Sequence, residues 1–313
     1  MEGESFARQL LLVSRQALSI DFVRNVAGTM GARLAILAIG AVMGIVVTNI
    51  LGPERRGLVA LAVSFAAIVT QLSNLGLHSA NVYFIGKDRT QVGVLVGNSL
   101  LVGMAGTSTL AGTILLICVL YPNVAPAPII LLSIALLAAP LEMTNMFVQQ
   151  IFLGLKRIFT YNKLQLAIQI VNAVFILVLI AIDAVRPATV VLAIVASQTF
   201  ALLWSLLDMR GELNDSLRIS LKVLRASLGY GMRAYLAALF MFLVLKVDIL
   251  MVGYLLDETQ AGLYSVAVML GDMFYMLPVL VGSIPFPPLT GIEDAAHRWR
   301  QAKRVAWIVA GLM

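Results

Sequence analysis

Three cations lie inside stretches of this sequence that are otherwise apolar. Arg33 lies in the run 26–51, and Arg233 and Lys246 lie in the run 226–256. About 20 apolar residues cross a bilayer as a helix, and a central charge that faces lipid costs on the order of 2.5–3.5 kcal/mol. Cations at this depth are typical of a polar interior, so we expect all three side chains to contact an anionic substrate. The alternative for the arginines is that they extend to the cytoplasmic headgroups.

Carboxylates also lie within apolar runs. Glu142 is near the middle of 129–153, Asp272 is near the middle of 261–285, and Asp248 follows Lys246. At 100° per residue along one continuous helix, Asp248 shares a face with Arg233 to within about 60° and lies about 200° from Lys246. We expect Glu142, Asp248 and Asp272 to be polar groups of a cavity, or coupling groups for H⁺ or Na⁺. The alternative for Lys246 and Asp248 is a pair of interhelical contacts that only hold the bundle together.

A polar cluster interrupts the run 58–85 near its end. Asn74, Gly76, His78, Ser79 and Asn81 follow one another within eight positions. A helix break at membrane depth requires other groups to satisfy the backbone, so Asn74, His78 and Asn81 are further cavity candidates. His78 could titrate near neutral pH, although a packed polar histidine is the alternative.

Enzyme chemistry has no support in the sequence. Neither histidine has a cysteine or carboxylate at ligand spacing, and the glycine clusters lack the preceding strand of a dinucleotide site. We therefore expect no metal, no cofactor and no catalytic activity.

The composition predicts an all-α polytopic membrane protein. Hydrophobic residues make up 60% and charged residues 12%, and the mean hydropathy is +0.95. The net charge of +6 is spread over separate loops, which argues against nucleic-acid binding. A ninth span begins near Val305 and stops at Met313, so we expect a truncated chain. The eight full spans are expected at 26–51, 58–85, 92–120, 129–153, 158–182, 188–207, 227–256 and 261–285.

Basic residues are distributed unequally between the two sets of loops. Of the 22 lysines and arginines, 16 lie in loops on the N-terminal side, three lie in the opposite loops (Arg55, Arg56 and Arg186) and three lie within spans. Positively charged loops stay in the cytoplasm. We therefore expect a cytoplasmic (inner) membrane location with a cytoplasmic N-terminus. The outward loops are short and leave no room for an external catalytic domain.

An internal repeat predicts two lobes related by an axis along the membrane normal. An offset of 205 residues places LGPERRGLVALAV (51–63) over LDETQAGLYSVAV (256–268), with five identities in 13 positions. Coincidence among common residues is the alternative. The expected domains are a cytoplasmic leader (1–25), a six-helix N-lobe (26–207), a cytoplasmic linker (208–225) and an incomplete C-lobe (226–313).

The runs 51–86 and 247–278 resemble polysaccharide flippases, the O-antigen and exopolysaccharide exporters of the multidrug/oligosaccharidyl-lipid/polysaccharide (MOP) superfamily. The motifs that carry this resemblance are LGPERRGL (51–58), NLGL (74–77) and GLYSVA (262–267). The resemblance implies two six-helix lobes around a central cavity that opens to each side in turn. It also implies a lipid-linked oligosaccharide as cargo, with its pyrophosphate drawn to Arg33, Arg233 and Lys246. Membrane lipids and the polysaccharide assembly machinery are the other implied partners.

Three other functions compete with this interpretation. A cation-coupled multidrug exporter of the same superfamily would prefer an acidic cavity, whereas here three cations match three anions within the spans. A membrane-embedded glycan polymerase or ligase would need a long outer loop. A non-transporting scaffold is the third alternative.

Overall fold

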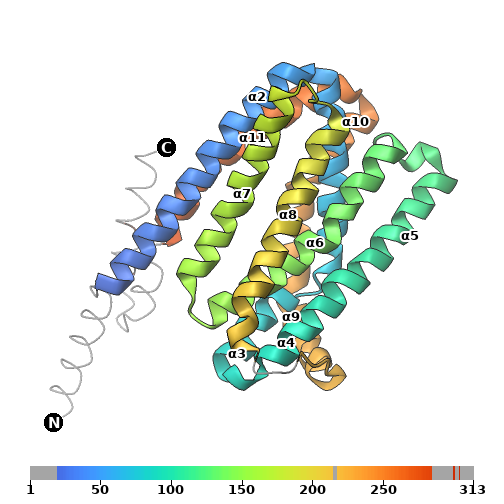
Figure 1. The fold of residues 1–313 in the computed structure, drawn as a ribbon. Helices are drawn as coiled ribbons and strands as arrows, with labels where there is room; N and C mark the ends of the chain where they lie inside the picture. Colours follow the sequence, from blue (N-terminus) through green and yellow to red (C-terminus); the bar gives the residue numbers. More distant parts are fainter. Residues whose placement is uncertain (1–19, 214–216, 284–298, 300–302, 304–313) are drawn as a thin grey trace, which may run out of the picture. The chain divides into compact units, whose positions relative to one another are not determined.

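The computed structural model describes residues 20–213 and 217–283, together with 299 and 303, and every regular element among them is helical. The predicted all-α class is therefore confirmed. Figure 1 shows the arrangement. The elements in chain order are α2 (Ile20–Ser73), α3 (Leu77–Lys87), η1 (Arg89–Gln91), α4 (Val92–Leu100), η2 (Leu101–Gly106, a π-helix), α5 (Thr107–Leu120), η3 (Pro122–Val124), α6 (Ile129–Gly154), α7 (Ile158–Ala181), α8 (Pro187–Met209), η4 (Arg210–Glu212), α9 (Leu221–Val244), α10 (Val247–Leu255) and α11 (Glu258–Ser283).

Two compact units divide the chain. One consists of residues 1–37 and 267–313, and the other of residues 38–266. Within the described residues, the smaller unit contains the helical segments 20–37 and 267–283. The predicted leader, lobes and linker are a different division of the chain, which stays a prediction. The predicted start of a ninth helix lies outside the described residues.

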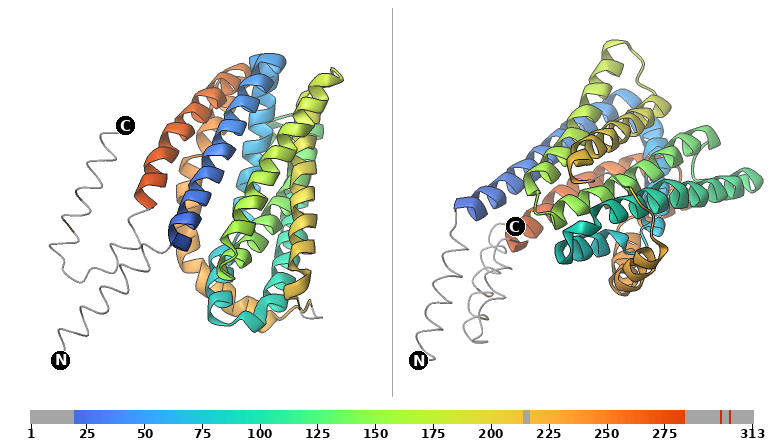
Figure 2. Two further views of the ribbon diagram at one scale, coloured as in Figure 1. Left: turned by 60° about the vertical axis from the view of Figure 1, so that its left-hand side comes forward. Right: turned by 60° about the horizontal axis from the view of Figure 1, so that its bottom comes forward.

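Helix α6 is central to the larger unit. It packs against α8, α3 and α5, and α8 packs in turn against α7; α7 and α8 lie side by side in both views of Figure 2. Ala135 and Ala139 are buried in the first half of α6, where small side chains allow neighbouring helices to approach. Phe147 and Phe152 are fully buried and fill the space around its second half.

The predicted membrane character is also confirmed. Within the described residues, six helical segments are long and apolar enough to cross a membrane, and the first of them, Gly28–Ser73, is 46 residues long. That segment bends at Gly52, whose φ of 74° is favourable only for glycine, and Pro53 follows. The bend separates the two spans that the sequence predicts at 26–51 and 58–85.

The predicted break in the second span is confirmed. α2 ends at Ser73 and α3 begins at Leu77, and both Leu75 and Gly76 have positive φ. The buried hydroxyl of Tyr235 on α9 donates to the carbonyl oxygens of Gln71 and Leu72, at 3.1 and 3.0 Å. A side chain from a distant helix thus provides hydrogen bonds to carbonyls in the last turn of α2.

The prediction of one continuous helix over 226–256 is wrong. α9 ends at Val244, Leu245 and Lys246 form a turn, and α10 begins at Val247. The rotation of 100° per residue does not carry across this turn, so the predicted common face of Arg233 and Asp248 has no basis. The break places a cation and a carboxylate at the start of a short second helix.

The two copies of the predicted repeat meet each other. A Cβ atom added at Gly57 would lie 1.7 Å from the carbonyl oxygen of Glu258, and one added at Gly262 would lie 1.9 Å from that of Pro53. Gly57 and Gly262 are equivalent under the 205-residue offset, and so are Pro53 and Glu258. Each copy therefore makes the same contact with the other, as a two-fold relation requires. This reciprocity supports a true repeat over a coincidence of common residues.

Candidate functional site

Arg233 is the candidate cation on α9. It lies 12 residues after the start of α9, about 18 Å along the helix axis. The buried stripe of α9, formed by Ser227, Gly231, Tyr235 and Leu239, belongs to the side that packs against α3 and α4. Arg233 is exposed, about 200° around the helix from Gly231, and no described carboxylate pairs with it. This arrangement leaves its five N–H donors available to a bound anion.

Arg33 is partly exposed and likewise has no carboxylate partner among the described residues. It belongs to the smaller unit, whereas Arg233 and Lys246 belong to the larger one. The convergence of the three cations on one anion therefore stays a prediction. Asp272 is an exposed residue of α11 in the smaller unit, and its place in a cavity also stays a prediction.

Lys246 and Asp248 lie at the helix break. Lys246 is the N-cap residue of α10 and is half-buried. Asp248 lies in the first turn of α10 and accepts hydrogen bonds from the backbone N–H of Ile249 at 2.7 Å and the hydroxyl of Tyr264 at 2.7 Å. Asp248 thus connects α10 to α11, which is the interhelical role that the sequence left open as an alternative.

Glu142 is exposed in the middle of α6, next to a buried stretch. Its neighbours Met143, Thr144 and Asn145 are all buried. The outward face of α6 carries Ile130 and Leu137, and Glu142 lies about 120–140° around the helix from that face. Its side chain is exposed.

The polar cluster at the second break forms local hydrogen bonds. His78 Nδ1 lies 3.0 Å from Asn74 Oδ1, and His78 Nε2 lies 3.0 Å from the hydroxyl of Ser79. Because Asn74 Oδ1 can only accept, Nδ1 carries the hydrogen and Nε2 accepts from Ser79, which fully satisfies a neutral ring. The fully buried Asn81 donates to Ser99 Oγ at 2.9 Å and to the carbonyl of Phe147 at 3.2 Å.

The linker is fixed to α4 by a buried amide. Asn98 donates to the carbonyl oxygen of Ser220 at 3.1 Å and accepts from its backbone N–H, also at 3.1 Å. Ser220 is the N-cap of α9, and its hydroxyl accepts from the N–H of Val223. The Gly93–Gly97 step of α4 allows the approach, since a Cβ at Gly97 would lie 2.5 Å from the carbonyl oxygen of Arg218. The orientation of α9, and therefore of Arg233, depends on this attachment.

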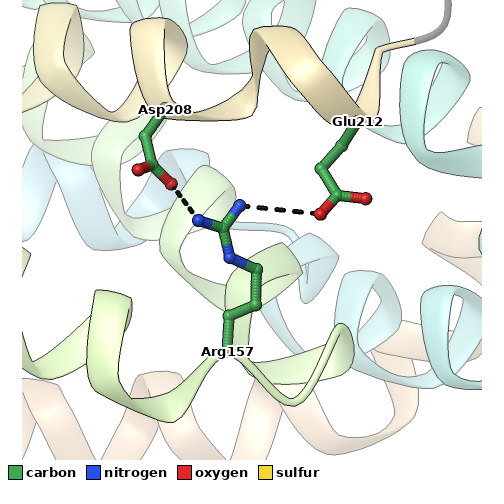
Figure 3. A network of polar contacts seen from close by, with 3 residues as sticks. All are labelled: Arg157, Asp208 and Glu212. Atoms are coloured by element: carbon green, nitrogen blue, oxygen red, sulfur yellow. Dashed lines mark hydrogen bonds and ion pairs between the residues drawn. The ribbon is translucent and has the colours of Figure 1, made fainter.

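Arg157 is a loop cation that is already neutralised. Its guanidinium lies 2.5 Å from Asp208 Oδ2 and 3.7 Å from Glu212 Oε1, between the end of α8 and η4 in Figure 3. It also lies 5.1 Å from the ring centroid of Phe152. Arg157 therefore ties the start of α7 to the end of α8 and is not available to a substrate.

Asp88 caps the short helix η1 in the loop that follows α3. Its carboxylate accepts from the hydroxyl of Thr90 at 2.7 Å, from the backbone N–H of Thr90 at 3.0 Å and from Gln91 at 3.0 Å. The hydrogen bond from the Thr90 hydroxyl is the main cause that lowers the pKa of Asp88 below its usual value. The group stays ionised at neutral pH and stabilises the loop.

Two features were not predicted from the sequence. The hydroxyl of Tyr235 on α9 bonds to backbone carbonyls of α2. Tyr83 stacks on Tyr230 with ring centroids 4.3 Å apart. A signal for the second was present, because Tyr230 stands between Gly229 and Gly231. Within the described residues, no group of three histidines, cysteines or carboxylates could hold a metal ion.

Comparison with known proteins identifies one family. A family model described as "Polysaccharide biosynthesis protein" matches residues 46–311. No curated protein and no solved structure matches the chain. The matched residues include both copies of the repeat, both helix breaks, Glu142 and Arg233.

Proposed function

Because the chain belongs to the polysaccharide biosynthesis protein family, we propose that it is a flippase that moves a lipid-linked oligosaccharide across the cytoplasmic membrane. The proposed role is transport rather than catalysis. The proposal includes a cytoplasmic N-terminus and membership of the MOP superfamily. The cargo carries an anionic pyrophosphate between its lipid and its glycan. Arg33, Arg233 and Lys246 bind that group, and the two repeats alternate in opening to each side.

The observation that carries the proposal is Arg233. An arginine that is exposed, lies on α9 two residues before the apolar span Tyr235–Leu255 and pairs with no described carboxylate suits a mobile anion. A guanidinium can hold two phosphate oxygens at once, whereas an ammonium acts as a point charge. The cargo supplies the missing negative charge when it binds and removes it when it leaves.

Coupling to H⁺ or Na⁺ is part of the proposal, and Glu142 is its best-placed carboxylate. The residue is accessible, and no described group bonds to it. The same observation favours the second candidate function, export of cationic drugs. A drug cation would bind Glu142, whereas a pyrophosphate would bind the arginines.

The test is glycan export by the full-length protein, measured per molecule of inserted protein. Arg33→Ala and Arg233→Ala are expected to abolish export while insertion is retained, and Arg→Lys at either position is expected to give a partial defect. Arg55→Ala is the matched control, because Arg55 is exposed on the turn that follows Gly52 and belongs to no described ion pair. Normal export by both alanine variants would contradict the anion-binding role.

A flipping assay in proteoliposomes separates the competing functions. Wild-type protein is expected to move a polyprenyl pyrophosphate-linked sugar and to leave a cationic dye in place. Dye transport by the wild type, lost in Glu142→Gln, with no movement of the lipid-linked sugar would favour drug export instead.

A further inference from the structure

Two tyrosines from different helices form an exposed aromatic pair. Tyr83 of α3 and Tyr230 of α9 stack with ring centroids 4.3 Å apart and an interplanar angle of 14°. Phe84 lies edge-on to both rings, at 5.3 Å from Tyr83 and 6.0 Å from Tyr230. The tyrosines are nevertheless 45% and 46% exposed. Each ring therefore keeps accessible surface while its orientation is held by its neighbours.

The backbone positions this pair. Gly76 and Gly231 touch, since a Cβ at Gly231 would lie 2.3 Å from the carbonyl oxygen of Gly76. Tyr230 directly precedes Gly231, and Tyr83 lies two turns after Gly76 along α3. The tyrosine pair is thus fixed by a backbone contact and does not depend on a mobile loop.

The exposed side of α9 at Tyr230 also carries Arg233. The two residues are three positions apart, and both are exposed. Tyr230 and Arg233 precede the apolar span Tyr235–Leu255, and the charge of the arginine makes this side of the helix better suited to a polar ligand than to acyl chains. Aromatic surface beside a cation that pairs with no described carboxylate matches a ligand that is both anionic and rich in C–H bonds.

We propose that Tyr83 and Tyr230 form a carbohydrate platform that binds the sugars next to the pyrophosphate held by Arg233. One face of a pyranose ring presents C–H bonds of slight positive charge, which pack on the negative face of an aromatic ring. The phenol hydroxyls can exchange hydrogen bonds with the sugar hydroxyls. The inference rests on the proposed function and adds to it the part of the cargo that these residues recognise.

The experiment uses the full-length protein in nanodiscs and two probes, polyprenyl pyrophosphate-linked disaccharide and polyprenyl pyrophosphate without sugar. Tyr83→Leu and Tyr230→Leu are expected to weaken binding of the glycosylated probe by about three- to ten-fold and to leave binding of the bare probe unchanged. Tyr230→Phe keeps the ring and is expected to retain most of the affinity. Tyr121→Leu is the control, because Tyr121 is exposed elsewhere.

Several outcomes would overturn the platform. Equal losses for both probes would show that the tyrosines only pack α3 against α9, and unchanged affinity in both leucine variants would show that no sugar binds there. If wild-type protein binds neither probe, the proposed function fails and the platform fails with it. If wild-type protein binds the glycosylated probe and the leucine variants match it, the platform alone fails.

Discussion

Gly231 offers a sharp test of how α9 meets the second helix break. A Cβ atom at this position would lie 2.3 Å from the oxygen, 2.6 Å from the carbonyl carbon and 2.9 Å from the Cα of Gly76. All three are backbone atoms, which cannot move aside as the end of a flexible side chain can. Gly229 lies two residues earlier on the same helix, and a Cβ there would meet nothing within 4 Å.

The pair of substitutions isolates the cost of the contact. Glycine to alanine in a helix by itself gains roughly 0.5–1 kcal/mol, and both variants share that gain. Overpacking typically destabilises a protein by about 1–3 kcal/mol, and only Gly231→Ala introduces it. We therefore expect Gly231→Ala to be less stable than Gly229→Ala by about 1–3 kcal/mol, and Gly229→Ala to match or exceed the wild type.

Thermal unfolding in detergent, followed by the recovery of monodisperse protein, measures this ranking. Gly231→Ala should lose its monodisperse fraction at a lower temperature than the other two proteins. If Gly231→Ala and Gly229→Ala unfold together, the backbone contact between α9 and the turn at Gly76 does not exist in the folded protein. The placement of Tyr230 beside Tyr83 would then lose its support.

Two further predictions concern the repeat and the orientation. Gly57→Ala and Gly262→Ala should each lower the free energy of unfolding, because each Cβ would meet a backbone oxygen within 2 Å. The double variant should lose less stability than the sum of the two single losses, since one substitution already separates the two backbones. Additive losses would show two independent sites. In a Cys118→Ala background, cysteines at positions 55 and 186 should react with an impermeant thiol reagent added outside, and labelling only after permeabilisation would reverse the predicted orientation.

Much of the fold could be predicted from the sequence because helix lengths follow the thickness of the bilayer. The expected spans 129–153 and 158–182 correspond to α6 (Ile129–Gly154) and α7 (Ile158–Ala181). Proline and glycine marked the turn at Gly52, and clustered polar residues marked the break after Ser73. These signals are local, so they do not depend on how the helices pack.

The break between α9 and α10 could not be predicted in the same way. The residues from Phe240 to Val252 contain neither glycine nor proline, and the helix is interrupted at Leu245 and Lys246 all the same. Tertiary contacts decide this point: Asp248 bonds to Tyr264, and Gly253 packs on Leu61, where a Cβ would lie 2.4 Å from a leucine methyl. Contacts between distant residues override local propensity there.

The candidate cations were recognisable from the cost of charge in an apolar run, but their surroundings were not. Arg233 and Asp248 look alike in the sequence, as charged residues in one hydrophobic stretch. In the structure the arginine has no described counter-charge, whereas the carboxylate is occupied by a tyrosine hydroxyl. Composition identifies which groups are expensive to bury, and only the fold shows which of them have partners.

The two broken helices contact each other at three points. The α2–α3 pair meets the α9–α10 pair at Gly76 with Gly231, at the Gln71 and Leu72 carbonyls with Tyr235, and at Leu61 with Gly253. Transporters built from repeats bind substrates where discontinuous helices meet at the repeat interface. Each break carries polar groups, Asn74 and His78 at one and Lys246 and Asp248 at the other. Arg233 and the Tyr83–Tyr230 pair lie on the same helices, so in the proposed flippase headgroup and sugar recognition share the elements that are proposed to move.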